Sequence, residues 1–264
     1  MLDQLAPARR RLALALAAAV AVAVLAGAVT LVWRWQNAPD PVAQDRPGPV
    51  VVVAGYGGGT ASLGPLVSAL HAEGREVALF PPVGDNTGDL EDQARRLGIF
   101  VDEVRARTGS VSVDVVGYSA GGVVTRLWVR HHGGAAVARR VLTVASPHHG
   151  TSVAGLATQA TGCPVACEQL DPDSDLLRRL NAGDETPAGP QWATVRTATD
   201  QVVTPSVSAD LTGAVTMVVQ EYCPGATTSH GQLPSSPLVL AAVRTILGAG
   251  PPVAPASGSI DCEG

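Results

Sequence analysis

A chain of 264 residues, of which 46% are hydrophobic, is long enough to bury the core of one α/β domain. Its formal net charge of −5 gives it no basic surface of the kind that binds nucleic acid, so we expect no polyanionic partner. No internal repeat divides the sequence, and its apolar segments alternate between strand-like and helix-like patterns.

Residues 1–35 have the pattern of a membrane anchor or a signal segment. Three arginines at 9–11 precede residues 12–33, a run of 22 residues without a charge that would form a helix about 33 Å long. Because this length crosses a hydrocarbon core and arginines favour the cytoplasmic side, we expect a single-pass protein of the cell membrane with an extracytoplasmic domain. The alternative is a secreted protein with a cleaved signal peptide, since residues 26–28 resemble a cleavage site. Residues 29–33 continue the apolar run and favour the anchor.

Four prolines between residues 36 and 49 predict a stiff linker after this segment. Residues 50–248 alternate strand-like and helix-like patterns, which is typical of a doubly wound, mostly parallel α/β sheet. Residues 249–264 form a predicted C-terminal tail. The predicted strands cover residues 50–54, 76–80, 111–116, 140–145, 192–198 and 214–220, and the predicted helices cover residues 62–73, 89–107, 120–131 and 237–247.

The pentapeptide Gly-Tyr-Ser-Ala-Gly at 117–121 lies between a predicted strand and a predicted helix. A serine at such a sharp turn is exposed, and the flanking glycines leave room for the strand and the helix to approach each other. The start of the helix also places a positive dipole end near the reacting carbonyl. This pattern therefore predicts that Ser119 is a catalytic nucleophile.

A nucleophilic serine needs a histidine base, and in α/β-hydrolases the chain order is nucleophile, acid, histidine. His230 satisfies this order and lies in a Ser/Thr/Gly-rich loop between the last predicted strand and the last predicted helix. The other histidines precede the serine, end the helix that follows it, or lack a later acid to pair with; they are His71, His131, His132, His148 and His149.

The acid that orients the histidine should follow the strand before the last one. Asp200 stands directly after the predicted strand 192–198, at the carboxyl end where an open α/β sheet places its functional side chains. Asp210 is the alternative, but it precedes the last strand and so lies at the opposite edge of the sheet. We therefore predict a triad of Ser119, Asp200 and His230.

An acyl transfer site also needs two N–H donors for the developing oxyanion. One donor comes from the residue after the nucleophile, which is Ala120. The apolar strand 50–54 leads into Gly-Tyr-Gly-Gly-Gly at 55–59, where the backbone can approach a ligand closely, and we assign the second donor to the amide of Tyr56. This stretch is not a dinucleotide fingerprint, because Thr60 replaces the last glycine.

Together these motifs resemble the class 2 lipases of the α/β-hydrolase superfamily, in particular bacterial triacylglycerol lipases. The resemblance spans about residues 50–240 and rests on the segments AGYGGG at 54–59, GYSAGG at 117–122, SPHHGT at 146–151, LNAGDETP at 180–187, TDQVVTP at 199–205 and SHGQLP at 229–234. It implies an α/β-hydrolase fold and a lipase activity. The chain departs from the family at Ala54, where a histidine usually precedes the oxyanion glycine.

Four cysteines in an exported chain predict two disulfide bonds. Three pairings are possible, and we favour Cys163 with Cys167 and Cys223 with Cys262, because the second pair would fasten the C-terminal tail. Neither cysteine spacing nor the acidic residues form a recognisable metal motif, so we expect no metal and no cofactor.

The predicted function is that of a monomeric serine ester hydrolase that acts on lipids or small esters through an acyl-Ser119 intermediate. The connection 151–191 is a candidate for a small lid, and its modest length favours short to medium acyl chains. Two alternatives remain open. The same triad serves an acyltransferase, and the same fold serves a catalytically inactive binding module.

Overall fold

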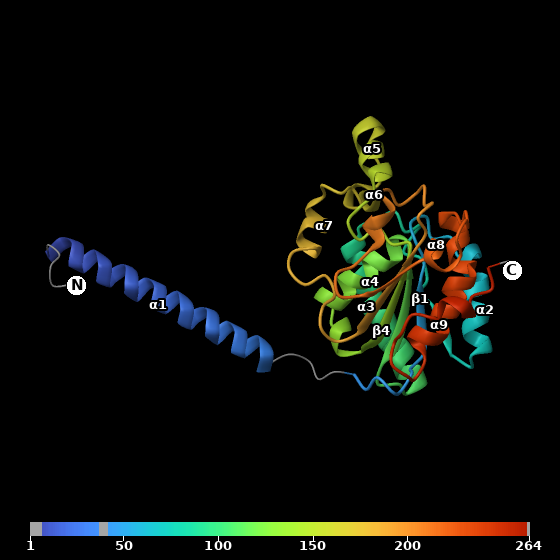
Figure 1. Cartoon of the computed structure of the whole chain (residues 1–264), viewed down its shortest axis with the longest axis horizontal. Coiled ribbons are helices and arrows are strands. Elements are labelled where there is room, and N and C mark those ends of the chain that lie inside the picture. The colour runs from blue at the N-terminus through green and yellow to red at the C-terminus, as the bar shows by residue number, and fades with distance from the viewer. Residues whose placement is uncertain (1–6, 37–41, 263–264) are drawn as a thin grey trace. The chain divides into compact units, whose positions relative to one another are not determined.

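The computed structural model describes residues 7–36 and 42–262, and the chain divides into two compact units, Met1–Asp40 and Pro41–Gly264. The first unit contains the 30-residue helix α1 (Pro7–Gln36), drawn in blue in Figure 1. Residues 37–41 of the predicted linker, and the side chains of Arg9 and Arg10, lie outside what the structure describes. Within the described ranges, no helix combines the length and the apolar character needed to cross a membrane.

The second unit is built on a six-stranded sheet in the order β2-β1-β3-β4-β5-β6, in which all neighbouring strands are parallel. Every residue of β1, β3 and β4 is buried, as expected of a sheet that is covered on both faces. The carboxyl ends of all strands therefore meet at one edge. The strands are β1 (Val50–Val53), β2 (Val77–Leu79), β3 (Val113–Tyr118), β4 (Ala138–Val144), β5 (Gln191–Arg196) and β6 (Val215–Val218).

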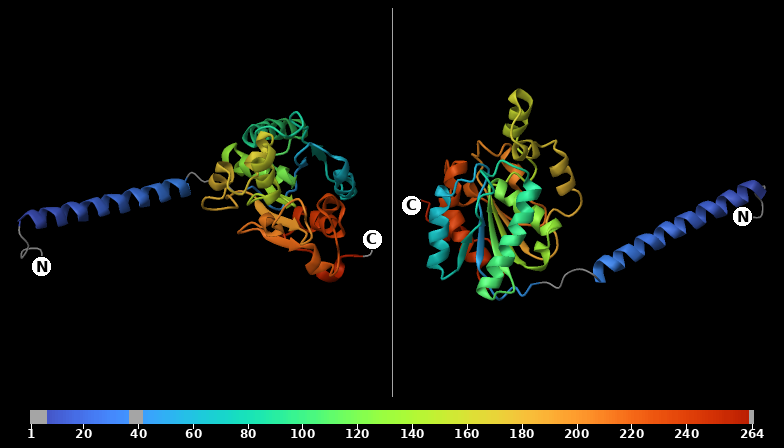
Figure 2. Two further views of the ribbon diagram at one scale, coloured as in Figure 1. Left: turned by 90° about the horizontal axis from the view of Figure 1, so that it is seen from above. Right: turned by 180° about the vertical axis from the view of Figure 1, so that it is seen from behind.

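Helices cover both faces of this sheet, as Figures 1 and 2 show. Val50 and Val52 pack with α2 and α9 on one face, whereas Val51 and Val53 pack with α3 and α4 on the other. This alternation follows from the two-residue period of a strand. The predicted doubly wound parallel sheet is confirmed. The four helices are α2 (Gly64–Ala72), α3 (Leu90–Thr108), α4 (Ala120–His131) and α9 (Pro237–Leu247).

Two parts of the unit differ from the predicted elements. The predicted strand 214–220 is too long, because β6 ends at Val218 and a helical turn, α8 (Val219–Tyr222), follows. The connection 151–191 contains three helices without a predicted counterpart: α5 (Ser152–Thr161), α6 (Val165–Gln169) and α7 (Asp175–Leu180). Short 3₁₀ segments complete the unit at Ala61–Leu63, Gly134–Ala136, Ser206–Ala209, His230–Ser235 and Ser257–Ser259.

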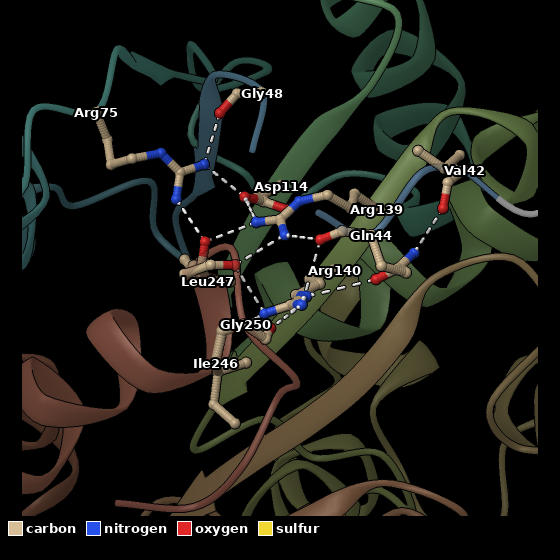
Figure 3. A network of polar contacts seen from close by, with 11 residues as sticks. Val42, Gln44, Gly48, Arg75, Asp114, Arg139, Arg140, Ile246, Leu247 and Gly250 are labelled. Carbon is tan, nitrogen blue, oxygen red and sulfur yellow. Dashed lines mark hydrogen bonds and ion pairs between the residues drawn. The ribbon is translucent and has the colours of Figure 1, made fainter. Parts of the chain in front are cut away.

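A buried polar network joins the amino ends of β3 and β4 to the end of α9 (Figure 3). The Asp114 carboxylate accepts hydrogen bonds from Arg75 and Arg139, and the side chains of Asp114 and Arg139 are fully buried. Other guanidinium donors of Arg75, Arg139 and Arg140 reach backbone carbonyls at the C-terminal end of α9, where a cation is favourable, and carbonyls of the segment before β1. The Arg140 Nε also donates to the side-chain Oε1 of Gln44 at 3.4 Å. The carbonyl acceptors are those of Gln44, Gly48, Ile246, Leu247, Gly248 and Gly250.

Both predicted cysteine pairs lie at disulfide distance. Cys163 and Cys167, with a Cα–Cα distance of 5.8 Å, bridge the loop between α5 and α6. Cys223 and Cys262, with a Cα–Cα distance of 5.6 Å, join the residue after α8 to the C-terminal tail. The second bridge fastens the tail beside the loop that leads to His230.

Candidate active site

Ser119 stands at the turn between β3 and α4, with a φ of 53° and a ψ of −128°. A non-glycine residue rarely adopts such a positive φ, and this conformation costs on the order of 1–3 kcal/mol. Hydrogen bonds on both sides of the turn hold it in place: the Ser119 amide donates to Val144 at 2.8 Å, and its carbonyl accepts from Gly122 at 3.0 Å. The serine side chain is thereby presented at the carboxyl edge of the sheet.

The glycines around this turn are required by close backbone contacts. A Cβ at Gly117 would lie 2.6 Å from the Cα of Gly122, and a Cβ at Gly121 would overlap the carbonyl oxygens of Val53 and Ala54. The elbow therefore packs directly against the end of β1. This contact brings Ser119 next to the glycine-rich loop that follows β1.

His230 and Asp200 reach the same edge from two other segments. The His230 Nε2 lies 3.1 Å from the Ser119 Oγ, and the His230 Nδ1 lies 2.9 Å from the Asp200 Oδ2. His230 begins a 3₁₀ segment whose capping box involves Ser229, while Asp200 follows β5. The structure thus brings the three predicted side chains together in the order that a serine nucleophile, its base and an orienting acid require.

Hydrogen bonds keep the Asp200 side chain ionised. Burial by itself raises the pKa of this carboxyl, but hydrogen bonds from His230 and from the amides of Val203 and Val202 outweigh that effect. The amides of Val202 and Val203 donate to Oδ1 at 2.8 and 2.9 Å, which leaves Oδ2 for the imidazole. The pKa of Asp200 therefore lies below its ordinary value, and the carboxylate is available to balance a positive charge on His230.

Tyr118 is a contact of the histidine that the sequence pattern did not identify. Its hydroxyl donates to the backbone carbonyl of His230 at 3.2 Å, and the two rings are 5.2 Å apart between centroids. Burial, together with the nearby charge of Asp200, raises the pKa of Tyr118 to about 12. The hydroxyl is therefore a neutral donor that ties the histidine loop to the strand carrying the serine.

The two amides predicted to hold an oxyanion flank Ser119. Ala120 is the first residue of α4, and Tyr56 follows Gly55, at which a Cβ would lie 2.8 Å from the Cβ of Ser119. Among the described residues, neither the Tyr56 amide nor the Ala120 amide has a hydrogen-bond acceptor. Both amides are thus available to a ligand at Ser119.

An apolar cavity of about 160 Å³ opens beside Ser119. Its walls come from the Tyr56 loop, the start of the 151–191 connection and the loop after Asp200; they include Pro147, Val153, Ala154, Ala157, Leu170, Val202 and Val203. A larger hollow of about 500 Å³ lies between residues 80–84 and α3, and Ser119, Asp200 and His230 do not line it.

The structure gives other partners to His148, His149 and Asp210, which the sequence did not favour as the base or the acid. His148 is fully buried against Thr143, at 3.0 Å, and His149 bonds Glu185 at 2.7 Å. Asp210, the alternative acid, pairs with Arg196 at 2.7 Å.

His131 and His132, at the C-terminal end of α4, share one acidic partner from the first turn of α3. His131 and His132 each lie 2.9 Å from the Glu91 carboxylate. Across residues 7–36 and 42–262, no group of three or more His, Cys, Asp or Glu side chains is arranged to hold a metal ion.

The segment that contains Ser119, Asp200 and His230 matches a known protein family. The family model for Lipase (class 2) matches residues 92–239, which include Ser119, Asp200 and His230. The chain belongs to the class 2 lipases. Membership of this family, together with the hydrolase fold, supports ester hydrolase activity. No curated protein matches this class 2 lipase significantly.

Solved structures share the fold of this class 2 lipase. Aspergillus fumigatus lipase B is similar with a TM-score of 0.69 at 18% identity, over 85% of this chain and 58% of the fungal one. The chain therefore spans a little over half the length of that protein. The mature form of Bacillus licheniformis lipase BlEst2 is similar with a TM-score of 0.62 at 18% identity, over 80% of this chain and 95% of the other.

Proposed function

We propose that this class 2 lipase cleaves carboxylic esters of glycerides through an acyl-enzyme formed on Ser119. The observation that carries this proposal is the continuous hydrogen-bonded series from the Ser119 hydroxyl through His230 to Asp200, with distances of 3.1 and 2.9 Å. A serine at a strained strand-to-helix turn, with a histidine base within hydrogen-bond distance, is the arrangement with which α/β-hydrolases form an acyl-enzyme. The catalytic unit is the domain of residues 50–248.

In the first half-reaction, the His230 Nε2 accepts the proton of the Ser119 hydroxyl as the Oγ attacks the ester carbonyl carbon. The carbonyl π electrons move to oxygen, and the amides of Tyr56 and Ala120 donate to the resulting oxyanion. Collapse of the intermediate expels the alcohol, which takes its proton from His230. Water then repeats the sequence on the acyl-Ser119 ester and releases the fatty acid. Throughout, the Asp200 carboxylate stabilises the imidazolium.

The cavity beside Ser119 supports a short to medium acyl chain. A cavity of about 150 Å³ holds a benzene-sized molecule, so the observed 160 Å³ encloses roughly six carbon atoms. Exposed apolar side chains continue outward from it, with Val153 46% and Leu156 67% exposed on α5 and Val202 45% exposed opposite. Longer chains would extend over this surface, which supports water-insoluble glycerides as substrates as well as short esters.

The disulfide pairs support an extracytoplasmic location. Structural disulfides persist in oxidising compartments, and both pairs belong to the catalytic unit or its tail. We therefore propose that the protein is exported and that the catalytic unit works outside the cytoplasm.

The Ser119→Ala variant tests the proposed chemistry. It should abolish hydrolysis of p-nitrophenyl butyrate and covalent labelling by a fluorophosphonate, while the melting curve remains that of the wild type. The matched control is Ser68→Ala, an exposed serine on α2, which should retain both activities. Labelling that persists in Ser119→Ala would refute the assignment. Free fatty acid as the main product in water would favour hydrolysis over acyl transfer to an alcohol.

Chain-length preference is measured separately. A series of p-nitrophenyl esters from C2 to C18, run beside emulsified triolein, should show the highest kcat/KM for short to medium chains together with measurable release of oleate. Hydrolysis confined to the shortest esters, without oleate release, would contradict a lipase and indicate an esterase.

A further inference from the structure

The carbonyl oxygen of Gly55, in the loop after β1, is held by two donors. One is the amide of Gly58 at 3.1 Å, which closes the turn of the glycine-rich loop. The other is the side-chain Nδ2 of Asn86, at 3.3 Å, which comes from the loop before α3. Because Asn86 lies 31 residues further along the chain, its hydrogen bond attaches the glycine-rich loop to another segment of the domain. The hydrogen bond from Gly58 lies within the loop and cannot do this.

Asn86 is itself fixed at both ends. Its side-chain Oδ1 accepts a hydrogen bond from the Val83 amide at 2.8 Å. Because the Val83 amide is a donor, the atom facing it must be the oxygen, and the atom facing Gly55 must be the NH₂ group. Asn86 is only 3% exposed and has a φ of 56°, a conformation that asparagine tolerates better than most residues. It is a buried polar side chain with a defined orientation.

The geometry of the peptide bond links this contact to the active site. The carbonyl of Gly55 and the amide of Tyr56 belong to the same planar trans peptide, so they point in opposite directions. Holding the oxygen toward Asn86 therefore turns the Tyr56 N–H away from Asn86. Gly55 packs against the Ser119 side chain, and Tyr56 and Ser119 line the same cavity.

We propose that Asn86 is a positioning residue for the oxyanion hole: by holding the Gly55 carbonyl, it aims the Tyr56 amide at the oxyanion. This inference rests on the proposed function, since it requires an acyl transfer at Ser119. Ala54, the residue before Gly55, carries only a methyl group and has no polar atom for this task. The side chain of Asn86 supplies it from outside the loop.

Two substitutions of Asn86 remove its hydrogen bond to the Gly55 carbonyl and are expected to leave the fold intact. Asn86→Asp keeps an oxygen for the Val83 amide but places a carboxylate oxygen against the Gly55 carbonyl, so the carbonyl keeps only the Gly58 amide as a donor and is repelled by the new charge. Asn86→Gly accommodates the positive φ and removes the side chain entirely. Because oxyanion contacts act in the transition state, both variants should lower kcat by about 10²-fold and leave KM near that of the wild type.

A transition-state analogue provides a readout that a merely structural role would not move. An alkyl trifluoromethyl ketone accepts the Ser119 Oγ at its carbonyl carbon; the carbonyl π pair becomes an oxyanion, and the serine proton passes to His230. The affinity for this ketone should fall in both variants by about the same factor as kcat/KM. The control is Asp85→Asn, which replaces a carboxylate by an amide at the neighbouring exposed residue. Among the described residues, the Asp85 side chain forms hydrogen bonds with Thr87 alone.

The wild-type enzyme must first hydrolyse the ester and be labelled at Ser119; failure here would refute the proposed function itself. If the wild type is active, parallel losses of kcat and ketone affinity in Asn86→Asp and Asn86→Gly, with wild-type values for Asp85→Asn, support the positioning role. A wild-type kcat in either Asn86 variant would overturn it. So would a rise in KM with unchanged kcat, because that result describes general substrate binding.

Discussion

Replacing Asp114 with asparagine should destabilise the catalytic unit without altering its chemistry. The Asp114 side chain is 0% exposed and accepts hydrogen bonds from both Arg75 and Arg139, of which Arg139 is equally buried. Without the carboxylate, the buried Arg139 guanidinium and the partly exposed Arg75 guanidinium lose their counter-charge. Removing one partner of a buried ion pair costs roughly 3–5 kcal/mol of the free energy of unfolding.

The melting temperature measures this loss. For a domain of this size each kcal/mol corresponds to about 2–4 °C, so Asp114→Asn should melt about 6–20 °C below the wild type. At 20 °C its kcat should stay at the wild-type value, because the network lies at the amino ends of the strands, whereas Ser119, Asp200 and His230 lie at their carboxyl ends. The control Asp102→Asn removes an exposed pair with Arg105 and should change little. An unchanged melting temperature for Asp114→Asn would refute the reasoning.

Three further outcomes follow from the site and the core. Asp200→Asn should lower kcat by on the order of 10⁴-fold, because the imidazole then takes the wrong tautomer; Asp210→Asn should be active, and the reverse result would move the acid to Asp210. Burial lowers the pKa of His148 well below its ordinary value of 6.5. Its contribution to stability is therefore fully present above pH 6.5 and is lost as the pH falls toward the folded pKa. Urea unfolding between pH 8 and 5 should be less pH-dependent in His148→Phe, and an equal dependence would contradict this. Ala154→Leu should reduce kcat/KM for C6 and C8 esters more than for acetate, whereas the same change at Ala160, an exposed residue of α5 that does not line the cavity, should not; equal effects on all chain lengths would count against the assigned acyl cavity.

The elements that the sequence predicted well are those with strong periodicity and clear ends. The predicted helices 120–131 and 237–247 have the same bounds as α4 and α9, because the elbow fixes the first and a proline and a glycine delimit the second. The helices of the connection 151–191 were missed. They have 5–10 residues each, too few for a clear period, and α5 and α7 begin at side-chain caps rather than at apolar repeats.

The candidate site was predictable where chain order and sheet topology constrain it. Parallel strands bring their carboxyl ends to one edge, so residues after β3 and β5 had to lie near each other. The contacts of Tyr118 and Asn86 were not predictable in the same way. Each contact joins a loop to a segment far along the chain. Such a contact depends on the conformation of the loop, which no local sequence pattern predicts.

The connection from β4 to β5 has a consequence for how substrate range can change. This segment supplies much of the proposed acyl cavity, including Ala154, Ala157 and Leu170, whereas Ser119, Asp200 and His230 come from segments outside it. Since β4 and β5 are adjacent parallel strands, this segment leaves the carboxyl edge of the sheet after β4 and returns to the amino edge at the start of β5. It can be lengthened, shortened or exchanged without changing the strand order that holds the reacting groups. We therefore expect chain-length preference and catalytic competence to vary independently in this scaffold, both in evolution and in the laboratory.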